Sequence, residues 1–471
     1  MSFEWYGRAV RTDPPLARTA SDRPALIAEE TVTYGQLERD IETWRGELER
    51  RGIGGGTAVL LQAVPSVTYL ALLYALWRRG AGVMLADPRL RVAETDELIE
   101  RFRPDYVMRG RSKPAAFVTF RSVDDIGIEP LRPGRAPDGP QPPGFALMQF
   151  TSGTTGRPKA VVRTGPSLLA EIGRVGGIAG GIGPQDTVAV LASLHHSFGL
   201  IGGVMTSLAC GASVLVPPSV QASVILERLS AAEATTLLGV PLHFELLAGM
   251  GGGGRGRLRA AVCGGEPLDA SVAYRFAERF GVQVGQAYGT TETGMLAADW
   301  TGERPGTVGR CLDGIECAAP GGELLVRLPQ SPYADDAGSE RFKDGWLHTR
   351  DAAEIEPDSG LVRLHGRLDS IRIIGGLKVD ALETERCLGG HPEVEEARVV
   401  FTDGSRMEAY LAGKPGMDLA DVLQWCADRL AAYKIPRAFY RVPALPRTPN
   451  GKPVRDPAAL AACAGTPGTD D

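Results

Sequence analysis

A short segment rich in glycine and hydroxyl side chains could hold a phosphate group. Residues 150–159 read Phe-Thr-Ser-Gly-Thr-Thr-Gly-Arg-Pro-Lys and follow the apolar run 145–148. Glycines let successive backbone N–H groups converge on one anion, hydroxyls add donors without bulk, and Lys159 supplies a positive charge. The segment is not a Walker loop, because no Gly-Lys-Ser/Thr follows its last glycine. Taken alone, it could also be a flexible turn without a ligand.

The same segment resembles the phosphate-binding signature of the acyl-adenylate-forming enzymes, a superfamily that includes acyl-CoA synthetases, luciferases and the adenylation domains of nonribosomal peptide synthetases. That signature usually ends in Pro-Lys-Gly, and this chain has Ala160 in the last position. A small residue is kept there, so we expect the loop to function. Further motifs of the family occur in its order between Thr33 and Lys452, and this order is far more specific than any one motif. The chain therefore resembles a stand-alone member of this superfamily.

A second motif lies at residues 286–294, which read Gln-Ala-Tyr-Gly-Thr-Thr-Glu-Thr-Gly and are similar to the family's YGxTE motif. Tyr288 offers a flat face for adenine, Thr291 can donate to a phosphate oxygen, and Glu292 can hold Mg²⁺ against the phosphates. Taken alone, the motif would be better explained as a buried tyrosine before a capped turn.

A third motif lies at residues 345–351, which read Gly-Trp-Leu-His-Thr-Arg-Asp and are similar to the family segment that ends in Thr-Gly-Asp. The aspartate of that segment binds both ribose hydroxyls, as acidic residues do in dinucleotide folds, so the resemblance gives this role to Asp351. Arg350 stands where glycine is usual, and backbone strain or an extra contact with solvent is expected there.

The next motif, Gly-Arg-Leu-Asp at residues 366–369, matches the family's GRxD. The resemblance makes Arg367 a nucleotide contact and Asp369 the hinge between two domains. The following segment resembles the part of the family that enters the active site for thioester formation. Either Gly375 or Gly376 would make the close approach, and the spacing does not decide between them.

The last motif lies at residues 445–455, which resemble the family's PxTxxGKxxR signature. In that family the lysine, here Lys452, reaches the substrate carboxylate and the α-phosphate. A lysine on a loop is usually only solvated, but its co-occurrence with GRxD and the phosphate loop favours a catalytic role.

Together these motifs imply two half-reactions. A carboxylate attacks the α-phosphorus of ATP and pyrophosphate leaves; cations must lie between the two anions, and Mg²⁺ at Glu292, the phosphate loop and Lys452 would supply them. A thiol then attacks the acyl adenylate and AMP leaves, after the small domain turns about Asp369. Coenzyme A and the phosphopantetheine of an acyl or peptidyl carrier protein are equal alternatives for the thiol.

The acid that is activated would be bound near residues 192–199, which resemble the segment that walls the family's acyl pocket. No acidic residue occurs between positions 188 and 210, so the ammonium group of an ordinary α-amino acid would lack a partner. His196 and Phe198 are predicted to gate and line a pocket for an aryl or acyl acid, with a place in the core as the alternative. Glu266 is assigned to the nucleotide edge, although a distal amine on the substrate stays open.

The complete set of predicted site residues combines these motifs. The catalytic residues are Lys452, Glu292, Thr291 and His196. The ATP- and AMP-binding residues are Thr151, Ser152, Gly153, Thr154, Thr155, Gly156, Lys159, Gly264, Gly265, Glu266, Pro267, Tyr288, Gly289, Thr290, Asp351 and Arg367. The substrate pocket consists of His196, Phe198, Gly199, Val240, Gly264, Gly289, Gly294 and Met295. Glu292 and Thr154 are the metal ligands.

The elements that must position these residues follow an α/β pattern. Apolar, β-branched runs alternate with helix-like segments, which is typical of layered and mostly parallel sheets. We expect a large N-terminal domain over residues 1–366, which includes a small β-meander or barrel-like part. A small, mobile α+β domain should follow over residues 367–460, with a disordered tail at 461–471.

Four local expectations follow from the same patterns. The Pro- and Gly-rich residues 124–144 are expected to form a loop, and residues 200–220 a buried strand-turn unit. Residues 345–348 and 354–356 are expected to form two short strands of the meander. Residues 419–430 are expected to form a helix.

The composition excludes several classes of function. The 471 residues carry a net charge of −6, so no basic excess points to nucleic acid or an anionic membrane. Seven scattered cysteines without a CxxC pair argue against a disulfide framework or a structural zinc site. No apolar stretch resembles a signal peptide or a membrane span, which predicts a cytoplasmic protein without membrane insertion. The oligomeric state stays open, as do an amino-acid-activating enzyme, a non-catalytic nucleotide-binding relative and a kinase or NTPase.

Overall fold

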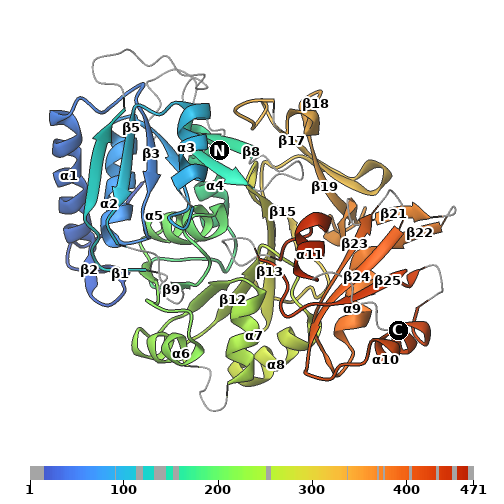
Figure 1. Cartoon of the computed structure of the whole chain (residues 1–471). Coiled ribbons are helices and arrows are strands. Elements are labelled where there is room, and N and C mark those ends of the chain that lie inside the picture. Colours follow the sequence, from blue (N-terminus) through green and yellow to red (C-terminus); the bar gives the residue numbers. More distant parts are fainter. Residues whose placement is uncertain are drawn as a thin grey trace. The chain divides into compact units, whose positions relative to one another are not determined.

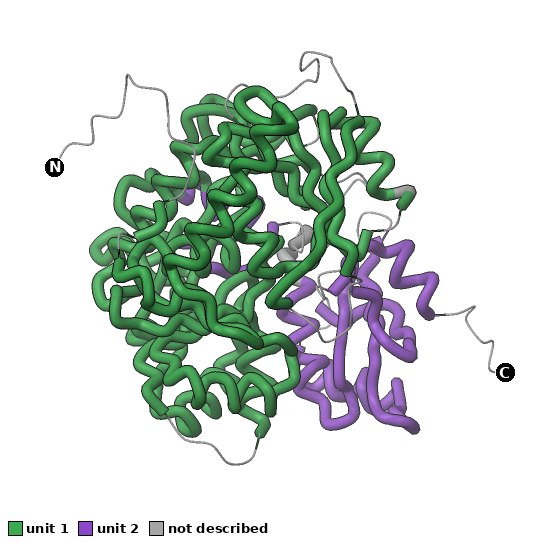
Figure 2. The backbone as a smooth tube through the Cα atoms, turned by 90° about the vertical axis from the view of Figure 1, so that its left-hand side faces the viewer, with its two compact units in different colours: residues 1–318, 325–349, 355–363 green, residues 319–324, 350–354, 364–471 purple. Residues whose placement is uncertain are grey.

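The structure is a computed structural model that describes most of the chain. The described residues are 15–17, 19–90, 92–112, 120–131, 145–151, 159–250, 256–336, 338–368, 371–374, 377–402, 406–430, 434–447 and 453–464. The chain forms two compact units (Figure 2). Residues 1–318, 325–349 and 355–363 belong to unit 1, and residues 319–324, 350–354 and 364–471 belong to unit 2. The domain boundary expected after residue 366 stays a prediction.

Unit 1 contains a six-stranded sheet with the strand order β6-β5-β3-β4-β7-β8; its strands β3, β5 and β8 are labelled in Figure 1. Its strands are β3 (Ala58–Gln62), β4 (Gly82–Leu85), β5 (Tyr106–Gly110), β6 (Ile126–Pro130), β7 (Phe145–Thr151) and β8 (Lys159–Thr164). The four central strands are parallel, and the edge strands β6 and β8 run antiparallel to their neighbours. The central strands are nearly continuous apolar runs, as expected where both faces of a sheet are covered.

A nine-stranded sheet in the same unit has the order β15-β14-β13-β12-β11-β9-β10-β1-β2. Its strands are β1 (Pro24–Ile27), β2 (Thr31–Thr33), β9 (Thr187–Val190), β10 (Ser213–Leu215), β11 (Thr236–Gly239), β12 (Ala260–Gly264), β13 (Val284–Thr290), β14 (Gly294–Asp299) and β15 (Arg310–Cys311). The strands from β13 to β1 are parallel. The antiparallel pairs β13–β14 and β14–β15 extend one edge.

Helices lie on and between these two sheets. They are α1 (Tyr34–Arg50), α2 (Val67–Arg78), α3 (Val92–Phe102), α4 (Gly165–Gly176), the π-helical η1 (Phe198–Met205), α5 (Thr206–Ala209), α6 (Ala222–Ala231), α7 (Pro241–Gly249) and α8 (Ala270–Phe280). The largest apolar cluster joins α1, α2, α4 and η1 to strands of both sheets. A second cluster packs α3 on the other face of the six-stranded sheet. A third packs α6, α7 and α8 on the nine-stranded sheet, so unit 1 is built in layers, as predicted.

A five-stranded sheet follows β15 in the chain, with the order β16-β17-β19-β18 and β20 paired with β19. Its strands are β16 (Cys317–Ala318), β17 (Glu323–Arg327), β18 (Phe342–Lys343), β19 (Trp346–Ile355) and β20 (Val362–Arg367). Short 3₁₀ turns, η2 (Pro320–Gly322) and η3 (Ser339–Arg341), lie between them. The expectation of separate strands at 345–348 and 354–356 was wrong, because residues 346–348 and 354–355 belong to the single ten-residue strand β19.

The rest of unit 2 is an α+β arrangement. It contains β21 (Ile371–Ile374), β22 (Leu377–Asp380), β23 (Val394–Thr402), β24 (Arg406–Gly413), β25 (Ala438–Arg441), α9 (Ala381–Gly389), α10 (Leu419–Ala427) and α11 (Pro457–Cys463). The buried Leu388 of α9 and Val422 of α10 pack with Val399 and Leu411 of the β23–β24–β25 sheet. Two boundaries differ from expectation: α10 ends at Ala427, and α11 includes residues 461–463 of the expected tail.

Two further expectations were wrong for identifiable reasons. Residues 124–144 include the strand β6, because residues 126–130 pair with the open edge of β5; Pro130 ends this edge strand, where a missing N–H does no harm. Residues 200–220 begin with η1 and α5 rather than a strand. Gly202 and Gly203 allow η1 to approach Met295 and Val190, since an added Cβ would lie within 3.2 Å and 3.0 Å of these side chains.

No helix in the described part of the chain is long and apolar enough to cross a bilayer.

The core behind α7 and α8 provides a test of this architecture. Phe276 of α8 is fully buried, and its ring lies 4.3 Å from that of Phe280 and 5.1 Å from that of Phe244, centroid to centroid. We expect Phe276→Ala to lower the free energy of unfolding by about 3–5 kcal/mol, because the cavity cannot close completely. Tyr274, on the same helix, is 64% exposed, so Tyr274→Ala should change it by less than about 1 kcal/mol. Equal losses in urea unfolding of the two variants would contradict this packing.

Candidate functional site

The residues of the YGxTE motif form a tight hairpin between β13 and β14. Gly289 faces Met295 and Thr290 faces Gly294 across the hairpin, and Thr291 and Glu292 lie in the turn. The turn is fixed by Thr293, whose hydroxyl accepts from the Thr290 backbone N–H at 3.3 Å. A Cβ on Gly289 would lie 2.3 Å from the Gly294 carbonyl oxygen. This hairpin therefore requires glycine at position 289, and the sequence motif encodes its geometry.

Glu292 is buried and held by residues far from it in the sequence. The Tyr333 hydroxyl donates to Glu292 Oε1 at 2.9 Å, and Arg341 Nη1 lies 3.7 Å from the same oxygen. Burial and the neighbouring Glu292 carboxylate raise the pKa of Tyr333, so its phenol keeps the proton that it donates. The carboxylate is thus presented in a fixed orientation.

Lys159 lies in the same neighbourhood. It is the register partner of Thr151, so the two ends of the phosphate loop meet as neighbours on β7 and β8. Its Nζ atom lies 3.8 Å from Glu340 Oε1. An added Cβ on Gly338 would lie 2.8 Å from the Tyr333 ring and 3.0 Å from Lys159 Cδ, so these two side chains border the same glycine. Ser152, Gly153, Thr154, Thr155 and Gly156 lie outside the described residues.

One segment, which carries Tyr333, Glu340 and Arg341, contacts both Lys159 and Glu292, and sequence reasoning did not identify it. It is attached to β8 by backbone hydrogen bonds: Val162 N–H donates to the Pro332 carbonyl at 2.7 Å, and Ala334 N–H donates to the Ala160 carbonyl at 2.9 Å. From there Tyr333, Glu340 and Arg341 reach the site. No spacing rule connects Tyr333 with Glu292, since 41 residues separate them.

The predicted pocket residues Phe198, Val240, Gly264 and Met295 come from four separate elements that meet. A Cβ on Gly264 would lie 2.9 Å from the Phe198 ring, and a Cβ on Gly202 would lie 3.2 Å from Met295 Cε and 3.9 Å from Phe198 Cδ2. Phe198 therefore lies against the end of β12, and Phe198 and Met295 both border the Cβ position of Gly202. The side chain of Val240, which precedes α7, lies 3.7 Å from the Cβ position of Gly265.

The remaining predicted residues around this pocket differ in burial. His196 is partly buried, and Gly199 packs so closely on the Ser193 carbonyl that a Cβ would lie 2.4 Å from its oxygen. Gly265, Glu266 and Pro267 are exposed where β12 ends, and Tyr288 on β13 is half-buried.

Gln149 is another residue that sequence reasoning missed. It is buried on β7, just before the phosphate loop. Its amide nitrogen donates to the His195 carbonyl at 2.8 Å, and its oxygen accepts from the Ser197 hydroxyl at 2.7 Å. It thus connects the strand that leads into the phosphate loop with the segment that carries His196 and Phe198. Burial lowers the pKa of His195, which keeps that ring neutral.

A buried ion pair supports the hairpin from α4 and β8. Glu171 is fully buried; its Oε1 accepts from the Met295 N–H at 2.9 Å, and its Oε2 lies 2.8 Å from Arg163 Nη2. The Arg163 side chain is 3% exposed. Gly294 has φ +71°, and a Cβ there would lie 2.0 Å from the Glu171 carboxylate. The sequence showed Gly294 but not the acid that requires it.

Within unit 2, Asp351 and Arg367 form one ion pair. Asp351 is buried on β19, and Arg367, the last residue of β20, approaches its Oδ1 to 3.2 Å. Arg350 has φ +63°, the left-handed region that favours the glycine usual at this position. Its N–H donates to Glu323 Oε1 at 3.0 Å, which stabilises this conformation. Asp369 and Lys452 lie outside the described residues, so the hinge and the catalytic lysine stay predictions.

Known families and proteins match most of the chain. Residues 15–323 match the family model described as AMP-binding enzyme, and residues 383–452 match that of the AMP-binding enzyme C-terminal domain. The p-hydroxybenzoic acid–AMP ligase FadD22 of Mycobacterium tuberculosis is 32% identical over 92% of this chain. The chain spans 66% of that relative's length, slightly less than two thirds. The 2-succinylbenzoate–CoA ligase of Bacillus licheniformis is 28% identical over 93% of this chain and 97% of its own.

Solved structures establish the fold. ATP-bound MatB from Rhodopseudomonas palustris matches with a TM-score of 0.78 at 23% identity, over 94% of this chain and 96% of that one. The O-succinylbenzoate coenzyme A synthetase MenE from Bacillus subtilis, in complex with AMP, matches with a TM-score of 0.77 at 23% identity, over 93% and 95%. The predicted α/β fold with a small α+β part is confirmed.

The buried ion pair yields a first prediction for the site. We expect Glu171→Ala to lower the free energy of unfolding by about 3–5 kcal/mol, because it leaves the Arg163 guanidinium buried without its partner. Replacing both residues, as in Arg163→Met with Glu171→Leu, should cost less, since no charge then remains buried. The exposed pair of Arg109 and Glu129 provides the control: Glu129→Ala should cost no more than about 1 kcal/mol. The free energies of unfolding of all three variants are measured by urea denaturation. An unchanged free energy of unfolding for Glu171→Ala would contradict the role of the pair.

A second prediction concerns pH. His243 Nδ1 accepts from the Val240 N–H at 3.1 Å, and burial lowers the pKa of His243 from 6.5 to about 4. The unfolded chain takes up this proton first, so the stability due to the neutral ring is complete above pH 6.5 and is lost as the pH falls to about 4. His243→Gln keeps an acceptor but does not titrate. Between about pH 7.5 and pH 4.5, the variant should lose about 2–3 kcal/mol less stability than the natural protein. Both proteins are unfolded with urea at the two pH values. Equal losses of stability for the natural protein and His243→Gln would contradict the role assigned to the neutral His243 ring.

Proposed function

Because the chain belongs to the family of AMP-binding enzymes, as its motifs predicted, we propose that it activates a carboxylic acid with ATP and passes the acyl group to a thiol. The activated species is the acyl adenylate, and pyrophosphate is its co-product. Relatives named as an acid–AMP ligase and an acid–CoA ligase support this reaction. The structural observation that carries the proposal is that Lys159 and Glu292 contact the same segment. Lys159 lies near Glu340, and Glu292 accepts a hydrogen bond from Tyr333.

The charges around this segment suit a triphosphate. Lys159 and Arg341 are cations with little solvent exposure, and a phosphate chain would interact with them more strongly there than in bulk water. Thr291, in the hairpin turn, would donate to a phosphate oxygen. Thr151 and Lys159, at the two ends of the phosphate loop, are already paired between β7 and β8.

Mg²⁺ fits the residues present. Glu292 offers a buried carboxylate, the hard oxygen ligand that Mg²⁺ prefers, and the Tyr333 hydroxyl orients it. Glu292 would hold the ion together with phosphate oxygens and the predicted ligand Thr154. When bound, the ion would supply charge neutralisation at the phosphates.

The order of events in the proposed reaction follows from these roles. The substrate carboxylate attacks the α-phosphorus in line, and the bond from this phosphorus to the bridging oxygen of pyrophosphate breaks. Lys452 would lie between the two anions during this step. A thiol then attacks the acyl carbon, and AMP leaves as its phosphate takes the bonding electrons. Asp369 would be the hinge that lets the second step follow the first.

We propose an aryl acid as the substrate class. The ring of Phe198 against Gly264, with Met295 nearby, forms an apolar wall that suits a planar group. The carboxylate of Glu171 accepts from the Met295 N–H and is already paired with Arg163, so it does not await the ammonium group of an amino acid. The names of both relatives described above contain an aryl acid, p-hydroxybenzoic acid and 2-succinylbenzoate, which supports this class.

We propose coenzyme A as the acceptor, with the phosphopantetheine of a carrier protein as the alternative. The 2-succinylbenzoate–CoA ligase, whose name specifies coenzyme A, matches along 97% of its length and supports this acceptor. The longer p-hydroxybenzoic acid–AMP ligase leaves the carrier-protein alternative open.

The test is pyrophosphate release from ATP and Mg²⁺ with benzoate, 4-hydroxybenzoate, short-chain acids, long-chain acids and amino acids. We expect release with one or more aryl acids and thioester formation when coenzyme A is added. Release only with hydroxylamine as acceptor would contradict coenzyme A and favour a carrier protein. Release only with amino acids would overturn the aryl-acid proposal. ATP binding without release for any acid would point to an acid outside this panel or to a carrier-protein acceptor, and the absence of ATP binding would favour a non-catalytic relative.

Variants test the residue roles in the same assay. Lys452→Ala and Glu292→Gln should each lower the rate of adenylation by about 10²–10³, because each removes charge stabilisation of the transition state. Lys414→Ala removes an exposed lysine elsewhere in unit 2 and should leave the rate unchanged. Near-normal adenylation by Lys452→Ala would show that this lysine does not lie between the reacting anions.

A further inference from the structure

Two cysteines that take no part in the proposed reaction lie side by side in unit 1. Cys311 ends β15 and Cys317 begins β16, and their sulfur atoms are 2.7 Å apart. Both are free thiols and both are partly exposed. A small rotation of either side chain would bring the sulfurs to a bonding distance of about 2.05 Å. The pair has no CxxC spacing, so a sequence pattern did not reveal it.

The backbone holds both thiols in place. Cys311 is the register partner of Ala297 on β14, and the next residue, Leu312, donates its N–H to the Leu296 carbonyl at 2.8 Å. Cys317 is the register partner of Val326 on β17. The thiols thus belong to two different sheets, and the contact between them does not depend on two mobile side chains meeting by chance.

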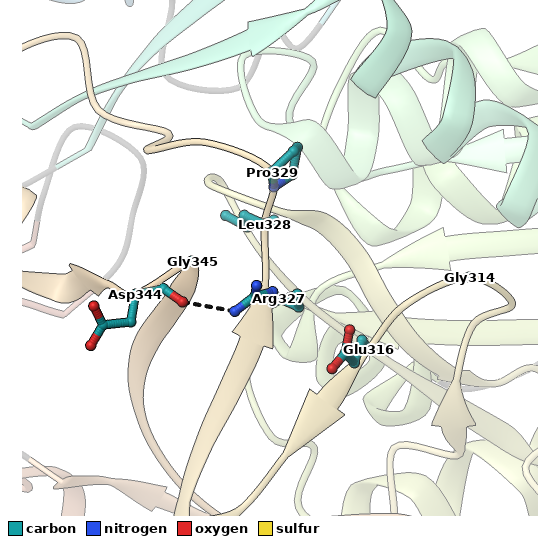
Figure 3. A pocket seen from close by; sticks show the side chains of 7 residues that line it. All are labelled: Gly314, Glu316, Arg327, Leu328, Pro329, Asp344 and Gly345. Atoms are coloured by element: carbon teal, nitrogen blue, oxygen red, sulfur yellow. Dashed lines mark hydrogen bonds between the residues drawn. The ribbon is translucent and has the colours of Figure 1, made fainter. Parts of the chain in front are cut away.

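The loop between the two cysteines is short and turned back on itself. Ile315 N–H donates to the Leu312 carbonyl at 3.0 Å, and Gly314 takes φ +76°, which a glycine adopts without strain. Gly314 and Glu316 of this loop line a surface pocket of about 430 Å³, together with Arg327 and Asp344 (Figure 3). None of the residues predicted for the adenylation site lines this pocket. The loop is therefore approachable from solvent.

The two thiols are not equivalent. The hydrogen bond between the two sulfur atoms lowers the pKa of the Cys311 thiol and raises that of Cys317. The thiolate is the reactive form of cysteine, so Cys311 is the thiol that reacts first.

We propose that Cys311 and Cys317 are a modification site, at which a small-molecule disulfide such as oxidised glutathione converts the two thiols into a reversible intramolecular disulfide. The Cys311 thiolate attacks one sulfur of the small disulfide, and one glutathione thiolate leaves. Cys317 then loses its proton and attacks the Cys311 sulfur, and the second glutathione thiolate leaves. Two protein thiols are oxidised, one small disulfide is reduced to two thiols, and two protons are transferred.

The consequence is a cross-link between the nine-stranded and five-stranded sheets. Because β15 pairs with β14, the cross-link would also restrain β14, which begins with the predicted pocket residues Gly294 and Met295. A second thiol pair, Cys387 and Cys426, offers a comparison, because these thiols also share a hydrogen bond. Cys426 is fully buried and Cys387 is partly exposed, so a dissolved disulfide can reach only Cys387 in the folded protein, and we expect this pair to be oxidised more slowly.

Peptide mass spectrometry tests the proposal directly. The natural full-length protein is equilibrated with oxidised glutathione, quenched in acid, alkylated and digested with trypsin. Residues 311–327 form one tryptic peptide that contains both cysteines and no internal Lys or Arg. We expect this peptide to be unalkylated and about 2 Da lighter than the dithiol form, and to become doubly alkylated after dithiothreitol. Cys463, on the separate peptide 456–471, should be free of internal disulfide throughout.

Two single variants make the outcome sharper. Cys317→Ser should trap glutathione on Cys311, and Cys311→Ser should react more slowly at Cys317, because the lower-pKa thiol attacks first. Doubly alkylated peptide 311–327 in oxidising buffer would overturn the proposal. So would stable glutathione adducts on the natural protein without ring closure. Faster oxidation of the Cys387–Cys426 pair than of the Cys311–Cys317 pair would contradict the argument that solvent access decides which pair reacts.

Discussion

The candidate site depends on one buried ion pair, between Arg163 and Glu171. A carboxylate without solvent needs a partner, and Glu171 has two: the Arg163 guanidinium and the Met295 N–H. These contacts connect β8, α4 and the β13–β14 hairpin, so the position of each fixes the others. Because β8 begins at Lys159 and the hairpin turn carries Glu292, the same pair sets the distance between the phosphate loop and the proposed metal ligand.

A second set of contacts determines the electrostatic surroundings of Glu292. The segment around Tyr333 adds to β8 through backbone hydrogen bonds and brings Tyr333 and Arg341 to Glu292. One buried carboxylate thus faces a phenol that keeps its proton and a guanidinium. Ordering these groups in a solvated loop would require a large free energy, whereas a backbone that is already fixed holds them in place with little further cost. A site for a triphosphate and its cation needs this kind of preorganised charge.

The sequence predicted what is local and missed what is distant. A turn at the YGxTE motif was predictable because Gly289 and Gly294 serve a geometry that nearly determines the motif. Backbone strain was expected at Arg350 because glycine is usual there, and its φ of +63° agrees. Glu171, Tyr333 and Gln149 were missed because their partners lie 124, 41 and 46 residues away. Periodicity shows that a residue is on a buried face, but it does not say which polar residue there will find a partner.

The two departures from the family pattern have only local structural effects. Ala160 replaces a glycine, and its side chain is fully buried in the apolar cluster between α3 and the six-stranded sheet. Arg350 replaces another, and its left-handed backbone costs about 1–2 kcal/mol, which the hydrogen bond to Glu323 partly offsets. Each change is absorbed within one or two neighbouring residues. Lys159 and Asp351, which follow from the same motifs, therefore keep buried positions with charged partners, as the proposed reaction requires.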